Sequence, residues 1–414
     1  MPVKRPFVLA AAAALAIIIP VLSAQESGLT LDQAVETALA RNPEVLAARA
    51  RIDAARGRTL QLRSRPEPQA AASVEGVPLP GLKREDDQVE IHLGIEQAFE
   101  YPGKRALRAE IGRQGEDMAA AELDRVRLLL TASVKKTYWN AAFAGAAVAA
   151  LERTSSRLDE LLEDLQTKYR TGAVSYADVL RARAEKARLR NQILDQAKDK
   201  RTAELELDEL LGREPSGPVA LLTTLPFVPL AGDPAALVER ARATLPSFRL
   251  SALRIEGAES AVKLARLSRN PDFLAGFLLP SVRPNGWGVS FGLTMPFLRP
   301  GRARGQAQEA SAEAEASRLA AAALDRHVRT AVESAYAAAK SAEEQVLVYE
   351  KSLLRELEDE LGIQLDYFRY GKAEAFSLLD LYRTYVLAQV EHLRALLLYN
   401  VALADLEVAG ESAN

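Results

Sequence analysis

Four segments of the chain alternate apolar and polar side chains, as a β-strand with two different faces requires. The clearest are residues 89–96 (VEIHLGIE) and 287–297 (WGVSFGLTMPF), and each follows a weaker one, at residues 70–77 and 273–279. A period of two that lasts about ten residues gives a strand one apolar and one polar face. We therefore expect four strands, near residues 69–77, 88–99, 272–281 and 286–297.

Longer segments carry apolar residues three or four positions apart, which is helical spacing. Leucines recur in this way within residues 106–167 and again between residues 354 and 365. The spacing is heptad-like and indicates a supercoiled contact between helices. At about 1.5 Å per residue, a helix of some 65 residues spans roughly 100 Å. Gly172 and Gly371 mark turns. We expect the return helices at residues 178–211 and 377–408.

A shorter helix is expected in front of each pair of strands. Thr30 is followed three residues later by Gln33, which is the spacing of a capping box. We therefore expect one helix over residues 34–65. In the second half Asp233 precedes Pro234, a pair typical of an N-cap and the first helical residue.

The chain repeats itself after about 200 residues. Pro68 returns as Pro271, 203 positions on, and FEYPGK at 99–104 returns as FLRPGR, 198 positions on. YRTG at 169–172 returns as FRYG, 199 positions on. Each half reads helix, strand, strand, long helix, long helix, and is far longer than a solenoid repeat. We predict a signal peptide at 1–24, a first repeat at 25–212, a proline-rich linker at 213–232, a second repeat at 233–410 and a tail at 411–414.

The first residues have the pattern of a cleaved secretory signal peptide. Lys4 and Arg5 precede an apolar run at residues 7–19, and Leu22-Ser23-Ala24 offers small residues for cleavage. The alternative is an uncleaved anchor, but the run has 13 residues, fewer than a membrane-spanning helix needs. No later uncharged apolar run reaches about 18 residues, so an exported chain that spans a membrane would do so with strands.

The composition excludes several classes of protein. The 414 residues include 53 Lys and Arg and 56 Asp and Glu, and the net charge of −3 is unlike that of a nucleic-acid-binding protein. The chain has no cysteine, which excludes disulfides, thiolate metal sites and lipidation on cysteine. His92, His327 and His392 are far apart, so they form no histidine-cluster motif. We find no paired acid and base, phosphate loop or nucleophile elbow, and predict neither an enzyme nor a cofactor.

Alternating strands of this length in an exported chain are typical of strands that cross a membrane. Lipid does not tolerate open sheet edges, and four strands are too few to close a barrel, so several chains would share one barrel. The polar face, which would line water, carries Glu90, His92 and Glu96. The lipid-facing aromatic residues would be Phe273, Phe277, Trp287 and Phe297. The alternative is that the aromatic residues form the buried face of an ordinary small sheet.

These motifs, in this order, resemble TolC-type outer-membrane efflux proteins. The resemblance rests on residues 30–43 (TLDQAVETALARNP), the two Tyr/Phe-Arg-x-Gly tips and the duplication, and it covers essentially the whole mature chain. EYPGKR at residues 100–105 is most similar to the CzcC branch, whose members work with heavy-metal resistance-nodulation-division pumps.

The resemblance implies an α+β membrane protein. A long α-helical coiled-coil tunnel would be joined to four transmembrane β-strands per chain, and a homotrimer would close a shared barrel of about twelve strands. It further implies a passive export channel of a tripartite system in the outer membrane, in contact with outer-membrane lipids. The partners would be a periplasmic adaptor and an inner-membrane resistance-nodulation-division pump. The alternative is a soluble periplasmic coiled-coil adaptor or scaffold, which has no need of alternating strands.

The resemblance also implies roles for the helix tips. In that family the tips form the periplasmic mouth and touch the adaptor, and the matching residues are Gly172, Ala173, Val174, Gly371, Lys372 and Ala373. Asp380 occupies a position that can project into the tunnel mouth, where three copies would form a ring of carboxylates that attracts cations. The alternatives are a solvated residue or an ion pair with Arg383. Asp178 is a weaker candidate for a gate, or an N-cap.

Four cations follow the two Pro-Gly motifs at the starts of the long helices. They are Lys104, Arg105, Arg302 and Arg304. A cation at a helix N-terminus opposes the helix dipole, so another partner should favour it. Anionic lipid head groups at the membrane edge are one candidate, and ordinary surface charge without a partner is the other.

Overall fold

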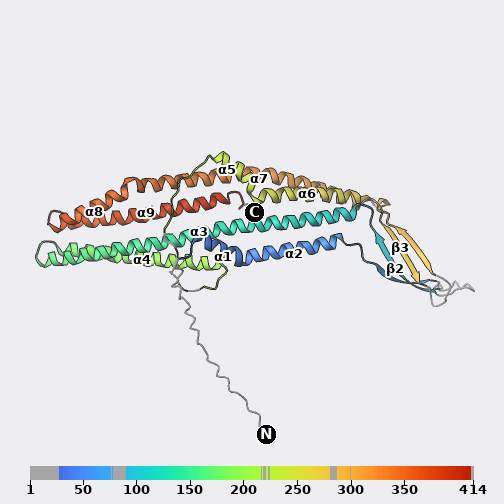
Figure 1. Ribbon diagram of the computed structural model, residues 1–414, viewed down its shortest axis with the longest axis horizontal. Helices are drawn as coiled ribbons and strands as arrows, with labels where there is room; N and C mark the ends of the chain where they lie inside the picture. The colour runs from blue at the N-terminus through green and yellow to red at the C-terminus, as the bar shows by residue number, and fades with distance from the viewer. Residues whose placement is uncertain are drawn as a thin grey trace, which may run out of the picture.

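The protein is an elongated helical body with a small β-sheet at one end (Figure 1). The computed structural model describes residues 28–75, 77, 90–215, 217, 221, 224–279, 287–298 and 300–411. The predicted signal peptide lies outside these residues. Among the described helices, none is both long enough and apolar enough to cross a lipid bilayer.

The first half forms two short helices and two long ones. They are α1 (Leu31–Arg41), α2 (Pro43–Arg63), α3 (Lys104–Arg170) and α4 (Tyr176–Leu210). Thr30 caps α1 through the predicted capping box, in which the Thr30 hydroxyl accepts from the Gln33 amide and the Gln33 side chain accepts from the Thr30 amide. At 67 residues, α3 runs from the sheet to the opposite end of the body.

The prediction of one continuous helix over residues 34–65 is wrong, because the helix is interrupted at Asn42. Pro43 disfavours helical geometry in the residue before it, and Asn42 is extended with φ −61° and ψ 130°. The Asn42 side chain then caps α2 by accepting from the Glu44 amide at 2.8 Å. Its amide nitrogen also donates to the Leu210 carbonyl at 3.0 Å, which ties this bend to the end of α4.

The second half has the same order of elements with one irregularity. Its helices are α5 (Pro234–Thr244), α6 (Pro246–Leu267), α7 (Pro300–Val348), α8 (Leu354–Arg369) and α9 (Ala375–Glu407). Asp233 and Pro234 begin α5 as the N-cap and the first helical residue. A π-helical turn, Tyr349–Leu353, joins α7 to α8, so the counterpart of α3 is interrupted.

The four strands form one antiparallel sheet in the order β1-β2-β3-β4. Their bounds are Gln69–Glu75, Glu90–Phe99, Phe273–Leu279 and Gly288–Leu293, within the ranges expected from the sequence. Ala70 lies opposite Ile95 in the first hairpin, and Phe273 lies opposite Leu293 in the second. These two pairs are related by the sequence offsets of 203 and 198 residues, so the two hairpins share one register.

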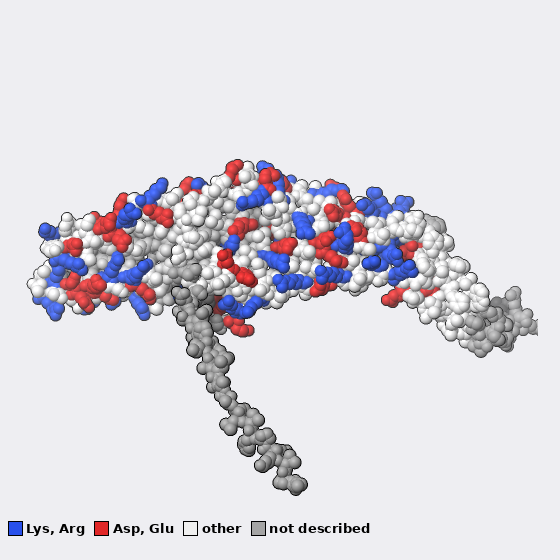
Figure 2. Space-filling view, viewed as in Figure 1, with Lys and Arg blue, Asp and Glu red and all other residues white. Residues whose placement is uncertain are grey.

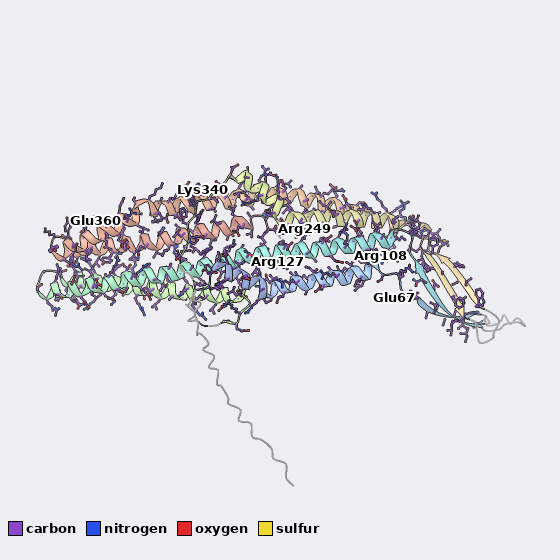
Figure 3. The ribbon with its side chains drawn as sticks, in the orientation of Figure 1. Glu67, Arg108, Arg127, Arg249, Lys340 and Glu360 are labelled. Carbon is purple, nitrogen blue, oxygen red and sulfur yellow. The ribbon has the colours of Figure 1, made fainter. Side chains whose placement is uncertain are left out.

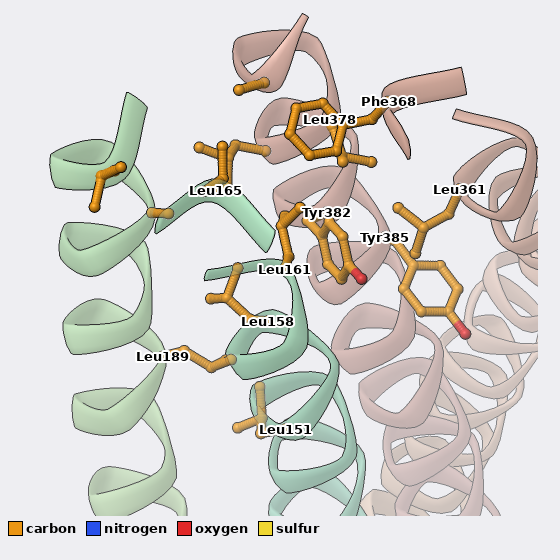
Figure 4. Close-up of a cluster of buried hydrophobic side chains, with 14 of the residues drawn as sticks. Leu151, Leu158, Leu161, Leu165, Leu189, Leu361, Phe368, Leu378, Tyr382 and Tyr385 are labelled. Atoms are coloured by element: carbon orange, nitrogen blue, oxygen red, sulfur yellow. The ribbon is translucent and has the colours of Figure 1, made fainter. Parts of the chain in front are cut away.

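The apolar core lies along the helical body rather than under the sheet. One cluster fills the half nearest the helix tips, where leucines of α3 meet α4, α8 and α9 (Figure 4). Leu158 and Leu165, two of the heptad-spaced leucines, are buried there, and Leu162 is partly buried. Each fully buried leucine contributes about 1.5–3 kcal/mol. A second cluster fastens α1 and α2 to α3, and holds the bend at Asn42 in place.

Candidate functional site

One face of the sheet is apolar and exposed. The register places the odd-numbered residues of β3 and β4 on the same face as Ala70, Ala72 and Val74 of β1. Apolar side chains on this face that are at least two-fifths exposed are Val74, Ile91, Leu93, Ile95, Phe99, Phe273, Phe277, Leu279, Val289, Phe291 and Leu293. Trp287 stacks on Phe277 with ring centroids 6.2 Å apart. A soluble protein rarely leaves so large an apolar patch uncovered, and this face requires an apolar surrounding.

The opposite face carries mainly polar and small residues, together with Leu274 and Leu278 of β3. His92 lies opposite Ser73, and Glu96 lies opposite Gln69 on one side and Gly276 on the other. The backbone of Glu90 lies in the same alternation, but its side chain, like that of Phe297, is outside what the structure describes. A methyl group at Gly94 would lie 2.8 Å from the Leu278 Cδ2 atom, so this face is closely packed. The two faces differ as predicted, and Glu96 and His92 both lie on the more polar one.

The junction between the sheet and α3 corrects one prediction. Lys104 was expected among cations at the membrane edge, but its side chain is buried. Its ammonium donates to the Asp272 carboxylate at 2.8 Å and to the Asn270 carbonyl at 3.0 Å. The Asp272 carboxylate also accepts from the Tyr101 amide at 2.7 Å. The partner that offsets the unfavourable helix dipole is therefore a carboxylate of the second repeat, not a lipid.

The other three predicted cations of this region are exposed. Arg105 lies at the start of α3, and Arg302 and Arg304 lie at the start of α7. Figure 2 shows basic side chains gathered at this end of the helical body, next to a sheet surface with few charges. A groove in the same region is lined by Arg63, Arg65 and Arg105 together with Tyr101.

The first helix tip is a tight turn with a capped return helix. Gly172 has φ 77°, a left-handed conformation that residues with a Cβ atom rarely adopt. Ala173 is exposed, whereas Val174 packs on the apolar cluster below. Asp178 is not the N-cap of α4. Ser175 is the cap, and the Asp178 carboxylate completes a capping box by accepting from the Ser175 amide at 3.1 Å and its hydroxyl at 2.6 Å.

The second tip lies beside the first and is bonded to it. Gly371 has φ 73°, Lys372 is exposed, and Ala373 packs on the apolar cluster. The Lys168 ammonium, at the end of α3, donates to the Arg369 carbonyl at 3.1 Å and lies 4.5 Å from the centre of the Phe368 ring. The two tips thus present one continuous surface at the end of the body (Figure 1).

Asp380 is exposed on α9, and Arg383, considered above as an alternative partner for it, binds a different carboxylate. The Arg383 guanidinium donates to the Glu185 carboxylate of α4 at 2.9 Å, and this hydrogen bond raises the pKa of Arg383. Among the described residues, no ion pair of Asp380 is formed. The sequence reasoning missed Glu185, although its distance from Arg383 is 198 residues, one of the repeat offsets.

A second missed feature is a histidine beside the π-helical turn. The His392 Nε2 atom of α9 lies 3.6 Å from a Glu350 carboxylate oxygen. Burial lowers the pKa of His392, and the neighbouring Glu350 carboxylate partly opposes that shift. The sequence offers no signal for this contact, because His392 is a lone histidine on a helix. Within the described ranges, no three His, Asp or Glu residues are grouped closely enough to hold a metal ion.

Comparison with known proteins identifies the first repeat. Residues 34–213 match the family model described as outer membrane efflux protein. This match covers less than half of the chain, and it includes the first two helices, the first two strands and the first long helical hairpin. No curated protein matches the sequence significantly.

Solved structures extend the similarity in fold to more than nine-tenths of the chain. The outer-membrane channel OprN is 19% identical, with a TM-score of 0.78 over 93% of this chain and 90% of that one. The MtrE outer membrane channel of Neisseria gonorrhoeae is 20% identical, with a TM-score of 0.74 over 92% and 88%. The CmeC outer membrane channel of Campylobacter jejuni is 15% identical, with a TM-score of 0.75 over 93% and 87%. The similarity in fold to these structures therefore includes the second half of the chain, which the family model does not reach.

Proposed function

We propose that the protein is the outer-membrane channel of a tripartite efflux system, a passive conduit that three copies form together. The observation that supports this most directly is the four-stranded sheet with one exposed apolar face. Among the described residues, no strand pairs with the outer edge of β1 or of β4. In lipid such edges must be satisfied by other strands, and three copies would supply about twelve, enough for a closed barrel.

The helical body would then form a tunnel that continues the barrel into the periplasm. A helix of 67 residues is about 100 Å long, which is several times the thickness of a bilayer core. The apolar face of the sheet ends where α2 ends and where α3 and α7 begin, and the basic residues lie at this boundary (Figure 2). We assign Arg105 and Arg304 to contacts with lipid phosphates there, since both are exposed and lie beside the apolar face.

The two joined tips are the proposed docking surface for the periplasmic adaptor. Gly172, Ala173, Gly371 and Lys372 are exposed at the end farthest from the sheet, while Val174 and Ala373 anchor the turns to the core. A rigid, exposed turn at the end of a rod suits docking, because little order has to be gained on binding. In this proposal the inner-membrane pump supplies the energy, and the channel itself is passive.

The substrates we propose are heavy-metal cations, with drugs as the alternative class. The support is the EYPGKR motif at residues 100–105 and the exposed carboxylate of Asp380. Three such carboxylates around one axis would raise the local concentration of cations. In this proposal Asp178 has no part in cation selection, because its carboxylate already accepts from Ser175 in the capping box of α4 and pairs with Arg181 at 3.2 Å.

The mass of the mature protein in detergent tests the channel against its main alternative. Protein extracted from outer membranes after an alkaline wash should have about three times the mass of one chain. A periplasmic coiled-coil scaffold would wash off the membrane and behave as a smaller soluble species, and that outcome would refute the channel. Loss of resistance to zinc or cadmium salts on deletion, without loss of drug resistance, would support the metal substrates. The reverse pattern would refute them.

A further inference from the structure

The contact between Lys104 and Asp272 occurs once within a chain. The equivalent position at the start of α7 has no partner strand within the same chain. Inside the chain, β2 pairs with β3, and the start of α3 contacts the start of β3 through Lys104 and Asp272. The repeat offsets relate β2 and α3 to β4 and α7, and relate β3 to β1. The equivalent partner of β4 and α7 would be β1, but β1 lies at the opposite edge of the same sheet. A second copy of the chain can supply it.

The observed register predicts how the two edges would meet. Ile95 lies opposite Phe277, and Gln97 lies opposite Ala275, in the β2–β3 pair. Adding 198 to the numbers of the β2 residues gives their equivalents in β4, and subtracting 203 from those of the β3 residues gives their equivalents in β1. This places Leu293 opposite Val74 and Met295 opposite Ala72. All four of these edge residues are exposed in the single chain. The apolar face would continue without a step from one copy to the next.

Both junctions combine a cation at the start of a long helix with a carboxylate just before a strand. The equivalents of Lys104, Asn270 and Asp272 are Arg302, Glu67 and Gln69. Each motif before the strand has one carboxylate and one amide around a proline, in the order Asn-Pro-Asp in one case and Glu-Pro-Gln in the other. Arg302, Glu67 and Gln69 are all exposed, and Glu67 lies in the connection between α2 and β1 (Figure 3). Both repeats therefore have a cation at this position, Lys104 or Arg302, and a carboxylate that can bind it, Asp272 or Glu67.

In the proposed shared barrel, β4 of one chain meets β1 of a second copy. We propose that Arg302 is bound by Glu67 and Gln69 of that copy, and that this contact fixes the antiparallel register with Leu293 opposite Val74. This inference rests on the proposed shared barrel, and deepens it by naming the register and the contact that fixes it. It also gives Arg302 a protein partner in place of the lipid phosphate first considered. Register needs such a device, because a slip of one residue would turn every apolar side chain to the wrong face.

The absence of cysteine makes the register directly measurable by crosslinking. Full-length protein carrying Val74→Cys and Leu293→Cys, or Ser73→Cys and Thr294→Cys, is oxidised in outer membranes. The two pairs sit on opposite faces of the sheet, so one of them has the spacing that favours a disulfide. The matched control is Ala70→Cys with Leu293→Cys, which the register separates by four residues, about 13 Å. We expect covalent species of two and three chains for at least one register pair, and single chains for the control.

The outcomes distinguish the register from the proposed function. Crosslinking of the control but of neither register pair, in protein that still extracts with the mass of several chains, would overturn the register and leave the channel intact. Single chains in every sample, with an uncrosslinked mass of one chain in detergent, would refute the shared barrel itself.

Charge exchange tests the proposed contact of Arg302. Arg302→Glu should lower the temperature at which the detergent-extracted assembly dissociates, and adding Glu67→Arg should restore most of the loss. Arg254→Glu, at an exposed arginine of α6, is the matched control, and should change the dissociation temperature much less, because Arg254 is not part of either junction. Failure of the double variant to recover would overturn the Arg302 contact.

Discussion

The buried ion pair at Asp272 leads to a quantitative prediction about the sheet junction. In the Asp272→Asn variant the side chain keeps its shape, so the Tyr101 amide at 2.7 Å still has an acceptor. The Lys104 ammonium loses the negative charge 2.8 Å away while remaining buried. Hydrogen bonds to charged groups contribute about 1.5–3 kcal/mol, and we take about 2 kcal/mol here because Asp272 is 32% exposed.

Hydrogen exchange measures this loss where it occurs. Local opening of the junction exposes the Tyr101 amide, and about 2 kcal/mol corresponds to exchange about 30-fold faster in a peptide that covers residues 99–107. Lys104→Met is the matched control. It removes the ammonium and leaves a partly exposed carboxylate that water can solvate, so we expect only about 1 kcal/mol, or about fivefold. Exchange in Asp272→Asn within threefold of the wild type, or a larger effect of Lys104→Met, would refute this reasoning.

Three further predictions concern the tips, the tunnel mouth and the π-helical turn. Gly371→Ala should cost about 1 kcal/mol through its left-handed φ and speed tip proteolysis about fivefold, whereas Gly362→Ala within α8 should not destabilise; equal effects would contradict this. Asp380→Asn should lower the cation-over-anion permeability ratio in planar bilayers about two- to threefold, and an unchanged ratio would remove Asp380 from the conduction path. Because burial lowers the pKa of His392, the unfolded state binds its proton more readily, so stability should fall as the pH drops below about 6.5. Hydrogen exchange in residues 345–355 at pH 7.5 and 5.5 should show this acid sensitivity, and a His392→Gln variant that keeps it would exclude His392 as the cause.

The strands and the two faces of the sheet could be predicted because both depend on local alternation. A strand shows its faces in the period of its own residues, and the order of apolar residues from 287 to 293 is sufficient for β4. The long helices were equally accessible through their leucine spacing. The break at Asn42 was signalled by Pro43, but the helical pattern on both sides of the bend concealed it.

The contacts that join the two repeats could not be read from local patterns. Lys104 and Asp272 are 168 residues apart in the sequence. Without its partner, a basic residue at the start of a helix cannot be distinguished from an ordinary surface charge. Glu185 of α4 and Arg383 of α9 are in contact only because the two helical hairpins lie side by side. In both cases one residue comes from each repeat, so the duplication limits the candidates even though it does not select them.

The separation of the two β-hairpins in the sequence has a consequence for when the apolar face of the sheet is formed. Each hairpin pairs strands that are close in the chain, whereas β2 and β3 join residues such as Phe99 and Phe273. Long-range pairing of this kind forms slowly, so the complete apolar face is assembled only after both repeats have been synthesised. Until then the apolar residues are dispersed among polar ones, and the mean hydropathy of the whole chain is −0.08. If the protein is the proposed outer-membrane channel, a chain arranged in this way would cross the inner membrane without being retained there, and would acquire its affinity for lipid only once the sheet is complete.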